Sequence, residues 1–420
     1  MTKNMKDSGV DWIGEIPENW NVIRVKNKFI NRKQIVGENV EKYERLSLTL
    51  KGVLKRDKND NNGLQPEKFE SYQILKEDEL VFKLIDLENV STSRVGLSKY
   101  EGLVSPAYII LNNKQESKYG YYYFLSMWQR EIFNKLGGVG VRSNLTVKDL
   151  LNIKYLDIPK NEKKEIVDYL DKKVPQIDEI IKITNTSIEE YKKYKYALIT
   201  KCVTNGINKN IYMKSTDVDW IGQVPQKWKC MKLKYIFSIK KDIAGKEGFD
   251  ILSVTQSGLK IKDISKNEGQ ISADYSKYQI VEKGDFVMNH MDLLTGWVDC
   301  SKYYGVTSPD YRVFKFKTPE LYSSEYYTYI MQICYKNKIF YGLGQGVSNL
   351  GRWRLQTDKF LNFILPVPPK EEQEQIVNYL DNKCTEIDNI IEQKQKLLVE
   401  MEAYKKSLIY ECVTGKREVK

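Results

Sequence analysis

The sequence predicts an α+β fold in which two mixed α/β domains are separated by two long antiparallel coiled-coil helices. Three observations lead to this prediction. The chain of 420 residues repeats itself once, and the first part of each repeat carries short β-branched and aromatic runs. The last part of each repeat spaces its apolar residues as a helix does. The length of 420 residues suggests two to four units, and the repeat predicts a pseudo-twofold internal duplication.

The duplication is visible in motifs that return after 203 to 210 positions. A period this long indicates a duplicated half rather than a solenoid. The most distinctive motif is Asp-Trp-Ile-Gly followed by a proline and a second tryptophan. The paired segments are 10–20 and 218–228, 105–108 and 308–311, 137–145 and 344–350, 166–171 and 376–381, and 202–204 and 412–414.

The two globular domains are predicted at residues 1–160 and 208–369. Short apolar runs such as 79–82 and 108–111 alternate with clusters of glycine, asparagine and aspartate such as 58–63. Such alternation is typical of a domain with many short strands and loops.

The two helices are predicted at residues 161–207 and 370–416. Steps of four and three residues fall mainly on apolar positions over about six heptads, which favours a coiled-coil seam over separate surface helices. A helix of about 40 residues would be about 60 Å long, and Pro175 is expected to kink the first helix. The predicted inward series is Ile166, Leu170, Lys173, Ile177, Ile180, Thr184, Ser187, Tyr191, Tyr194, Leu198 and Lys201, and 210 positions later Ile376, Leu380, Lys383, Ile387, Ile390, Lys394, Leu397, Met401, Tyr404, Leu408 and Glu411.

Composition excludes several classes of protein. No run of about 18 apolar residues occurs, and the first six residues lack the apolar region of a signal peptide, so we expect neither a membrane nor a secreted protein. Six cysteines are scattered without a Cys-x-x-Cys pair. This pattern favours reduced thiols and a cytoplasmic location over a disulfide scaffold or a zinc site.

The charge indicates a polyanionic partner. The chain has 67 basic and 56 acidic residues, a net charge of +11. The stretches 160–205 and 370–412 hold 16 lysines and 18 acids, a balance of −2, which leaves +13 on the rest of the chain. The excess positive charge therefore lies on the two globular domains, where nucleic acid would bind. A mildly basic proteome would give a similar net charge without such a partner.

Catalytic motifs are missing from the sequence. His290 is the one histidine and serves neither a zinc cluster nor a nuclease motif, and no P-loop occurs. Ser-Pro-Asp-Tyr at 308–311 and Phe-Tyr-Gly-Leu-Gly at 340–344 partly match the motifs of adenine methyltransferases. The second proline of that motif is missing from both repeats, so we expect no catalytic residues and no metal ligands.

The repeated Asp-Trp-Ile-Gly motif, the Ser-Pro-x-Tyr motif, the Pro-Pro-Lys-Glu-Glu-Gln start of the second helix at 368–373 and the Val-Thr-Gly end at 413–415 occur together. In these features the whole chain resembles the specificity subunit of type I restriction–modification systems. The first helix departs slightly, since it begins without the second proline and ends in Val-Thr-Asn-Gly at 203–206.

The resemblance implies two target-recognition domains and two spacer helices in a non-catalytic DNA-binding subunit. The implied partners are double-stranded DNA, two modification (methyltransferase) subunits and ATP-dependent restriction subunits. S-adenosylmethionine, ATP and magnesium would belong to those partners, with no cofactor on this chain. The helices implied to dock them carry Ile166, Leu170, Ile177, Leu198, Ile376, Leu380, Ile387 and Leu408.

Residues that contact DNA are predicted from chemistry and place. Phosphates favour lysine, arginine and loop amides, whereas bases favour arginine, asparagine, glutamine and serine. A solvated charged loop is the alternative for each residue. The tryptophans of the repeated motif are expected to be core residues. The predicted DNA contacts are Arg56, Arg94, Arg142, Ser143, Asn144, Gln256, Lys260, Asn289, Gln345, Ser348, Asn349, Arg352 and Arg354.

Two other functions stay open from the sequence. A structural adaptor would bind protein rather than DNA through the duplicated domains. A self-sufficient methyltransferase would transfer methyl groups without partners. The two domains differ strongly between their shared motifs. If the chain reads DNA, we therefore expect two different half-sites in an asymmetric target.

Overall fold

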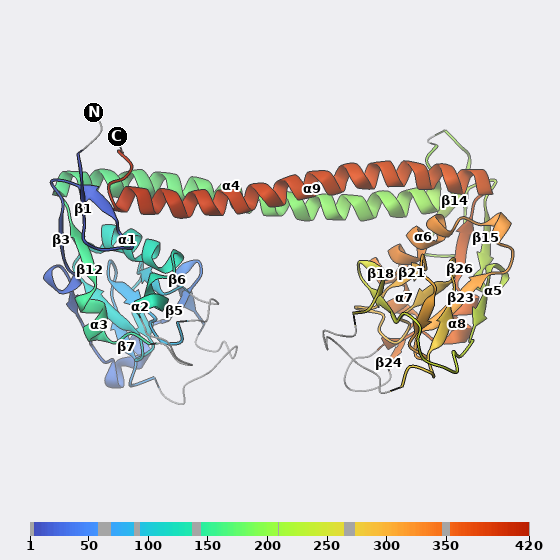
Figure 1. Cartoon of the computed structure of the whole chain (residues 1–420), viewed down its shortest axis with the longest axis horizontal. Helices are drawn as coiled ribbons and strands as arrows, with labels where there is room; N and C mark the ends of the chain where they lie inside the picture. Colours follow the sequence, from blue (N-terminus) through green and yellow to red (C-terminus); the bar gives the residue numbers. More distant parts are fainter. Residues whose placement is uncertain are drawn as a thin grey trace. The chain divides into compact units, whose positions relative to one another are not determined.

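The computed structural model describes residues 4–57, 69–87, 93–136, 144–208, 210–263, 274–346 and 353–419. It divides into two units (Figure 1). The first unit contains residues 1–185 and 396–420, and the second contains residues 186–395. Each unit holds one α/β domain and a segment of each long helix. The long helices are α4 (Lys160–Asn205) and α9 (Lys370–Val413).

The domain of the first unit is built on two four-stranded sheets, ordered β6-β5-β10-β7 and β4-β11-β8-β9, and two two-stranded sheets, β1-β2 and β12-β3. Helix α1 packs its buried tyrosines and phenylalanines in the same apolar core as strands β8 and β11. The elements are β1 (Met5–Asp7), β2 (Glu15–Pro17), β3 (Asn21–Arg24), β4 (Ile30–Asn31), β5 (Arg45–Thr49), β6 (Gly52–Arg56), β7 (Gln73–Leu75), β8 (Leu80–Phe82), β9 (Val95–Leu97), β10 (Gly102–Val104), β11 (Ile109–Asn112), β12 (Lys154–Asp157), α1 (Ser117–Gln129), α2 (Ile132–Leu136) and α3 (Val147–Asn152).

The domain of the second unit repeats this scaffold. Its four-stranded sheet has the order β16-β23-β20-β21, which corresponds to β4-β11-β8-β9. The elements are β13 (Met213–Ser215), β14 (Gln223–Pro225), β15 (Lys229–Lys232), β16 (Phe237–Lys240), β17 (Leu252–Thr255), β18 (Gly258–Ile261), β19 (Gln279–Val281), β20 (Phe286–Met288), β21 (Val298–Cys300), β22 (Gly305–Thr307), β23 (Arg312–Phe316), β24 (Gln345–Gly346), β25 (Trp353–Arg354), β26 (Ile364–Val367), α5 (Leu233–Ile236), α6 (Ser324–Lys336), α7 (Ile339–Gly342) and α8 (Thr357–Asn362).

Strand register gives the equivalence between the two sheets residue by residue. Phe82 pairs with Val95 on one side and with Ile109 on the other. Met288 pairs in the same way with Val298 and Arg312. Ile109 and Arg312 are therefore equivalent positions, although one is aliphatic and the other is charged.

The repeated Asp-Trp-Ile-Gly motif forms the same tight turn in both domains. Gly14 and Gly222 end the turn with φ of 72° and 69°, a left-handed conformation that glycine adopts at little cost. The tryptophans that follow, Trp20 and Trp228, are fully buried. Trp12 and Trp220 are half-buried.

Each domain holds the start of the helix that follows it. The indole Nε1 of Trp20 donates to Glu162 Oε2 in the first turn of α4 at 2.9 Å. In the second unit, Trp228 Nε1 donates to Glu372 Oε2 in the first turn of α9 at 2.8 Å. The motif tryptophan therefore fixes the direction in which each long helix leaves its domain.

Each domain also holds the end of the other long helix. In the first unit, the Tyr119 hydroxyl donates to the Val413 carbonyl of α9 at 2.8 Å. In the second unit, the Tyr326 hydroxyl donates to the Val203 carbonyl of α4 at 2.9 Å. Each unit consequently contains the beginning of one long helix and the end of the other (Figure 1).

Two ion pairs between α4 and α9 display the duplication. Lys405 Nζ lies 2.5 Å from Asp178 Oδ1 in the first unit, and Lys195 Nζ lies 2.6 Å from Asp388 Oδ2 in the second. The two lysines are 210 positions apart and so are the two aspartates. From one pair to the other α4 advances by 17 residues and α9 goes back by 17, so the helices run antiparallel. The predicted fold class is confirmed.

The buried stripe of each helix corrects the predicted seam at alternate positions. Every second inward residue lies one position later than predicted, a rotation of about 100° on a helix. The shift follows from apolar burial. At each shifted position, the residue one place later in the chain is less polar or better buried than the predicted one. Ile180 and Tyr194, predicted inward, are 44% and 56% exposed. The buried residues at shifted positions are Val174, Ile188, Cys202, Cys384, Ile391 and Cys412, next to Lys173, Ser187, Lys201, Lys383, Ile390 and Glu411.

Candidate nucleic-acid interface

A two-residue β-turn with exposed residues at its tip occurs in both domains. In the first, the Thr49 hydroxyl donates to the Gly52 carbonyl at 2.9 Å across the β5–β6 turn. In the second, Thr255 donates to Gly258 at 2.8 Å across the β17–β18 turn. The glycines have φ of 95° and 104°, which an L side chain rarely adopts. The turn is therefore a rigid platform that both domains share.

The exposed residues at the tips of these turns are chemically different. The first turn presents Leu50, which is 60% exposed, and Lys51. The second turn presents Gln256 and Ser257, both exposed. An amide and a hydroxyl can exchange hydrogen bonds with base edges, whereas leucine offers an apolar contact and lysine a charge. The shared platform thus carries two different sets of groups.

The predicted contacts next to these turns lie on the second strand of each hairpin. Lys260 is exposed on β18, and Arg56 is half-buried at the end of β6. Beside Arg56, Lys55 Nζ pairs with Glu44 Oε2 at 2.5 Å. Gln256 extends to the Thr295 carbonyl at 3.4 Å.

A second cluster forms in the second unit, where the segment after β20 meets the hairpin β24–β25. The Leu355 amide donates to the His290 carbonyl at 2.9 Å, and the Leu293 amide donates to the Trp353 carbonyl at 3.2 Å. These bonds place two predicted contacts on adjacent segments. Asn289 is half-buried, and Arg354 is exposed on β25.

The first unit has an equivalent junction. The Leu145 amide donates to the Leu84 carbonyl at 2.9 Å. The predicted contact Asn144 is exposed, and its Oδ1 accepts from the Asp86 amide at 2.9 Å. Leu84 corresponds to His290 and Leu145 corresponds to Leu355, so the fold holds the end of the glycine-rich segment in the same way in both domains.

Arg94 does not lie on the surface. Its side chain is 1% exposed, and its guanidinium donates to the carbonyls of Ile85 and Asp86. Burial lowers the pKa of Arg94. Its described contacts hold the segment after β8 from within the domain. The sequence did not reveal this, because Arg94 follows two serines in a stretch that resembles an exposed loop.

Several predicted contacts fall where the structure gives no side-chain position. Gln345 is described through its backbone, which pairs with Arg354. The others lie outside the described residues: Arg142, Ser143, Ser348, Asn349 and Arg352.

Sequence reasoning missed Arg312 and the environment of His290. Arg312 is 4% exposed, and burial lowers its pKa to about 10. His290 is 7% exposed, and burial, with the nearby charges of Arg312 and Arg354, lowers its pKa to about 3. Arg312 is a basic residue at the start of a strand, and its partner on the neighbouring strand is buried. That combination is the signal that could have identified it.

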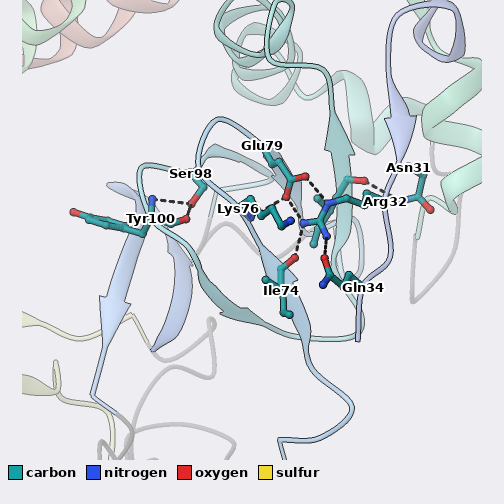
Figure 2. Close-up of polar contacts among 9 residues, drawn as sticks. Asn31, Arg32, Gln34, Ile74, Lys76, Glu79, Ser98 and Tyr100 are labelled. Atoms are coloured by element: carbon teal, nitrogen blue, oxygen red, sulfur yellow. Dashed lines mark hydrogen bonds and ion pairs between the residues drawn. The ribbon is translucent and has the colours of Figure 1, made fainter. Parts of the chain in front are cut away.

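A buried ion pair is present at the opposite end of the same sheet in each domain. Arg32 donates to the carboxylate of Glu79, to Gln34 Oε1 at 2.8 Å and to the Ile74 carbonyl at 2.6 Å (Figure 2). Glu79 also accepts from the Lys76 amide at 2.8 Å, so its carboxylate caps the turn before β8.

The second domain keeps this arrangement with other residues. Lys240 Nζ lies 3.0 Å from Asp285 Oδ2 and 2.8 Å from Glu282 Oε2. Asp285 accepts from the Glu282 amide at 2.9 Å and caps the turn before β20. The buried carboxylate with its cation is therefore a feature of the scaffold.

Two further properties concern the described part of the chain. Within it, no group of three or more histidine, cysteine, aspartate or glutamate side chains could hold a metal ion. None of its helices combines the length and the apolar character needed to cross a membrane.

The chain is similar in sequence to proteins of one family. Residues 225–400 match the family described as the type I restriction modification DNA specificity domain. Two relatives from Methanocaldococcus jannaschii, the type I restriction enzyme MjaVIII specificity subunit and the putative type I restriction enzyme MjaX specificity subunit, are each 25% identical. The alignments cover 96% of this chain and 94% of the first relative, and 97% of this chain and 96% of the second.

Solved structures share the fold. A chain solved in work on complex assembly and conformational transition of the type I R-M system matches with a TM-score of 0.68 at 10% identity, over 96% of this chain and 99% of that one. The HsdS subunit from Thermoanaerobacter tengcongensis matches with a TM-score of 0.53 at 11% identity, over 96% of this chain and 98% of that one.

Proposed function

We propose that this chain is a non-catalytic specificity subunit of a type I restriction–modification system and that it reads a bipartite DNA target with one domain for each half-site, a proposal that the sequence similarity supports. The observation that carries the proposal is a shared scaffold with different exposed groups. Both domains build the same rigid turn, yet one presents Leu50 and Lys51 and the other presents Gln256 and Ser257. Two half-sites of different sequence follow from this difference.

Charge supports a double-stranded DNA partner. The part of the chain outside the helical stretches has a balance of +13. Lysine and arginine that neutralise phosphates release counterions, so affinity should fall steeply with salt. Of the described candidates, Lys51, Lys260 and Arg354 are exposed and suit phosphate or base contacts. Asn289 and Asn144 lie on the segments beside the glycine-rich stretches, and with the undescribed Arg142, Ser143, Ser348, Asn349 and Arg352 they complete the proposed interface.

The long helices are proposed to dock two modification subunits, which in turn recruit restriction subunits. The predicted seam residues are not the contact surface, because seven of the eight are buried within the chain and Leu198 is half-buried. The outward faces of α4 and α9 would bind these partners. S-adenosylmethionine, ATP and magnesium would be bound by the partner subunits, in the cytoplasm.

Mapping of methylated adenines tests the proposal most directly. The chain is expressed with modification subunits in a host that lacks other methylation, and modified sites are sequenced. We expect one asymmetric target with two different half-sites. A symmetric palindrome would contradict the assignment of one half-site to each domain. Purified chain without modification subunits should transfer no methyl groups.

Salt dependence separates a DNA reader from a structural adaptor. The assembled complex is titrated with target DNA and with scrambled DNA between 50 and 200 mM salt, concentrations chosen to span the steep part of the expected dependence, about 10³-fold in affinity. The proposal requires retention that is selective for sequence and weakens with salt. Retention that depends on neither DNA sequence nor salt concentration would identify an adaptor.

The proposed spacer role of the helices has its own test. Gly206 lies against Trp228, so an insertion beside Asn205 would disturb this packing. Equal insertions of one heptad after Asn185 and after Gln395, which are 210 positions apart, keep the two helices in step. Each adds about 10 Å of helix, or about three base pairs at about 3.4 Å each. We expect a spacer lengthened by about three pairs with both half-sites unchanged, and an unchanged spacer would contradict the role.

A further inference from the structure

Arg312 links the sheet of the second domain to the segment that follows hairpin β24–β25. Its Nη2 donates to the Leu355 carbonyl at 3.0 Å and to the Thr357 hydroxyl at 3.3 Å. Its guanidinium carbon lies 4.5 Å from the centre of the Phe360 ring. Since Leu355 directly follows β25, the side chain holds one base of the hairpin that carries Arg354.

The charge of Arg312 is costly for the fold. Among the described residues no carboxylate lies within ion-pair distance of it. The described residues offer no hydrogen-bond partner to its buried Nη1 or to the buried Nδ1 of His290. Burying a cation without a carboxylate is unfavourable, and apolar residues of similar volume are often more stable at such positions.

The equivalent position in the first domain shows that the scaffold does not need this charge. Ile109 occupies it and pairs with Phe82 as Arg312 pairs with Met288. Stability alone therefore does not explain the arginine, which points to a role in the position of the hairpin.

In the first domain, the buried Arg94 occupies a different position from that of Arg312. Arg94 precedes β9, at the position that Trp297 occupies before β21. Arg94 holds the carbonyls of Ile85 and Asp86, whereas Arg312 holds the segment after β25. Arg94 and Arg312 are thus both buried, and they hold different segments of the proposed interface.

We infer that Arg312 is a positioning residue for recognition of the second half-site, because it fixes the base of hairpin β24–β25 through two hydrogen bonds from within the domain. This inference rests on the proposed function. It assigns the equivalent task in the first half-site to Arg94, which fixes Ile85 and Asp86. Neither guanidinium needs to touch DNA for this role.

The test uses the chain assembled with modification subunits and DNA libraries in which one half-site at a time is randomised. In R312M the side chain stays unbranched, is uncharged and loses both hydrogen bonds. We expect discrimination in the second half-site to fall about tenfold, the factor that corresponds to about one lost hydrogen bond to a charged group, with the first half-site unchanged. R94M is the matched control and should give the converse result.

Two further measurements separate positioning from contact and from general damage. R312K can reach only one of the two acceptors, so it should restore part of the discrimination. The slope of affinity against salt should not change in R312M, whereas loss of a phosphate contact would reduce that slope by about 1. A reduced slope would overturn the positioning role in favour of direct contact.

Each remaining outcome is decisive. If R312M is folded and discriminates at the second half-site as the wild type does, the inference is wrong and the proposed function stands. If R312M does not fold, R312K decides, because unchanged discrimination in R312K also overturns the inference. If the wild-type complex itself shows no discrimination at either half-site, the proposed function fails first.

Discussion

The two α/β domains agree at one end of their main sheet and differ at the other. At the shared end, a buried carboxylate caps a turn and pairs with a cation, as Glu79 with Arg32 (Figure 2) and Asp285 with Lys240. At the other end, Arg94 lies just before β9 and Arg312 lies on β23, and they hold different segments. The comparison teaches that the ion pairs preserve the scaffold, whereas the buried arginines and the turn tips are free to diverge with the half-site.

The largest expected effect comes from breaking the scaffold ion pair. Glu79→Ala leaves the half-buried guanidinium of Arg32 without its carboxylate, which should lower the free energy of unfolding of the first unit by about 3 kcal/mol. Asp285→Ala should cost less, because Glu282 remains 2.8 Å from Lys240. Urea unfolding of both variants measures the difference. Equal losses in the two domains would show that Glu282 gives Lys240 no support.

The second effect is a pH dependence confined to the second unit. The pKa of His290 is lowered to about 3 in the folded chain and is about 6.5 when unfolded. Below pH 6.5 the unfolded chain binds a proton that the folded chain does not, so stability falls as pH drops from about 6.5 to about 3. The loss should be about 2 kcal/mol at pH 5.

A matched variant isolates this histidine from the carboxylates that also titrate in acid. His290→Leu reproduces the residue found at the equivalent position, Leu84, and should remove about 2 kcal/mol of the difference in stability between pH 7 and pH 5. Unfolding curves at the two pH values provide the measurement. The same dependence in both proteins would mean that His290 is protonated in the folded state.

A smaller effect is expected from exchanging the turn tips. The double change Leu50→Gln and Lys51→Ser places the groups of the second turn on the platform of the first. Because base contacts discriminate by about 1 to 3 kcal/mol, the preference at some position of the first half-site should change by about tenfold or more, and the second half-site should not change. Methylation mapping with the partner subunits measures the preference at both half-sites. An unaltered first half-site would exclude this turn from recognition.

The smallest effect concerns the duplicated ion pairs between the helices. Lys405→Ala and Lys195→Ala each remove a partly exposed pair and should cost about 0.2 to 1 kcal/mol, less at high salt. The two losses should be equal, since the pairs are equivalent by duplication. Thermal unfolding at low and high salt checks this, and a loss several times larger for one lysine would show that the two pairs are not equivalent.

How much of the interface could be predicted depended on burial. Lys260, Arg354 and Asn144 are exposed as a loop or edge position suggests. Arg94 has the sequence context of a surface loop but is buried. Arg312 lies in strand β23, and only the packing of that strand in the sheet shows that its charged side chain is buried. A side chain's local sequence does not reveal which residues distant in the chain will cover it.

The sequence by itself determined the duplication, the two long helices and the resemblance to type I specificity subunits, because these depend on repeated motifs and on periodicity that are written along the chain. The tertiary structure decided what depends on contacts between distant segments. It selected Val174 and Cys202 over Lys173 and Lys201 for the seam, because one residue rotates a side chain by about 100° and only the partner helix shows which side is covered. It also buried Arg94 and Arg312 at positions that are not equivalent in the two domains, since burial is a property of the packed sheet and not of the residue.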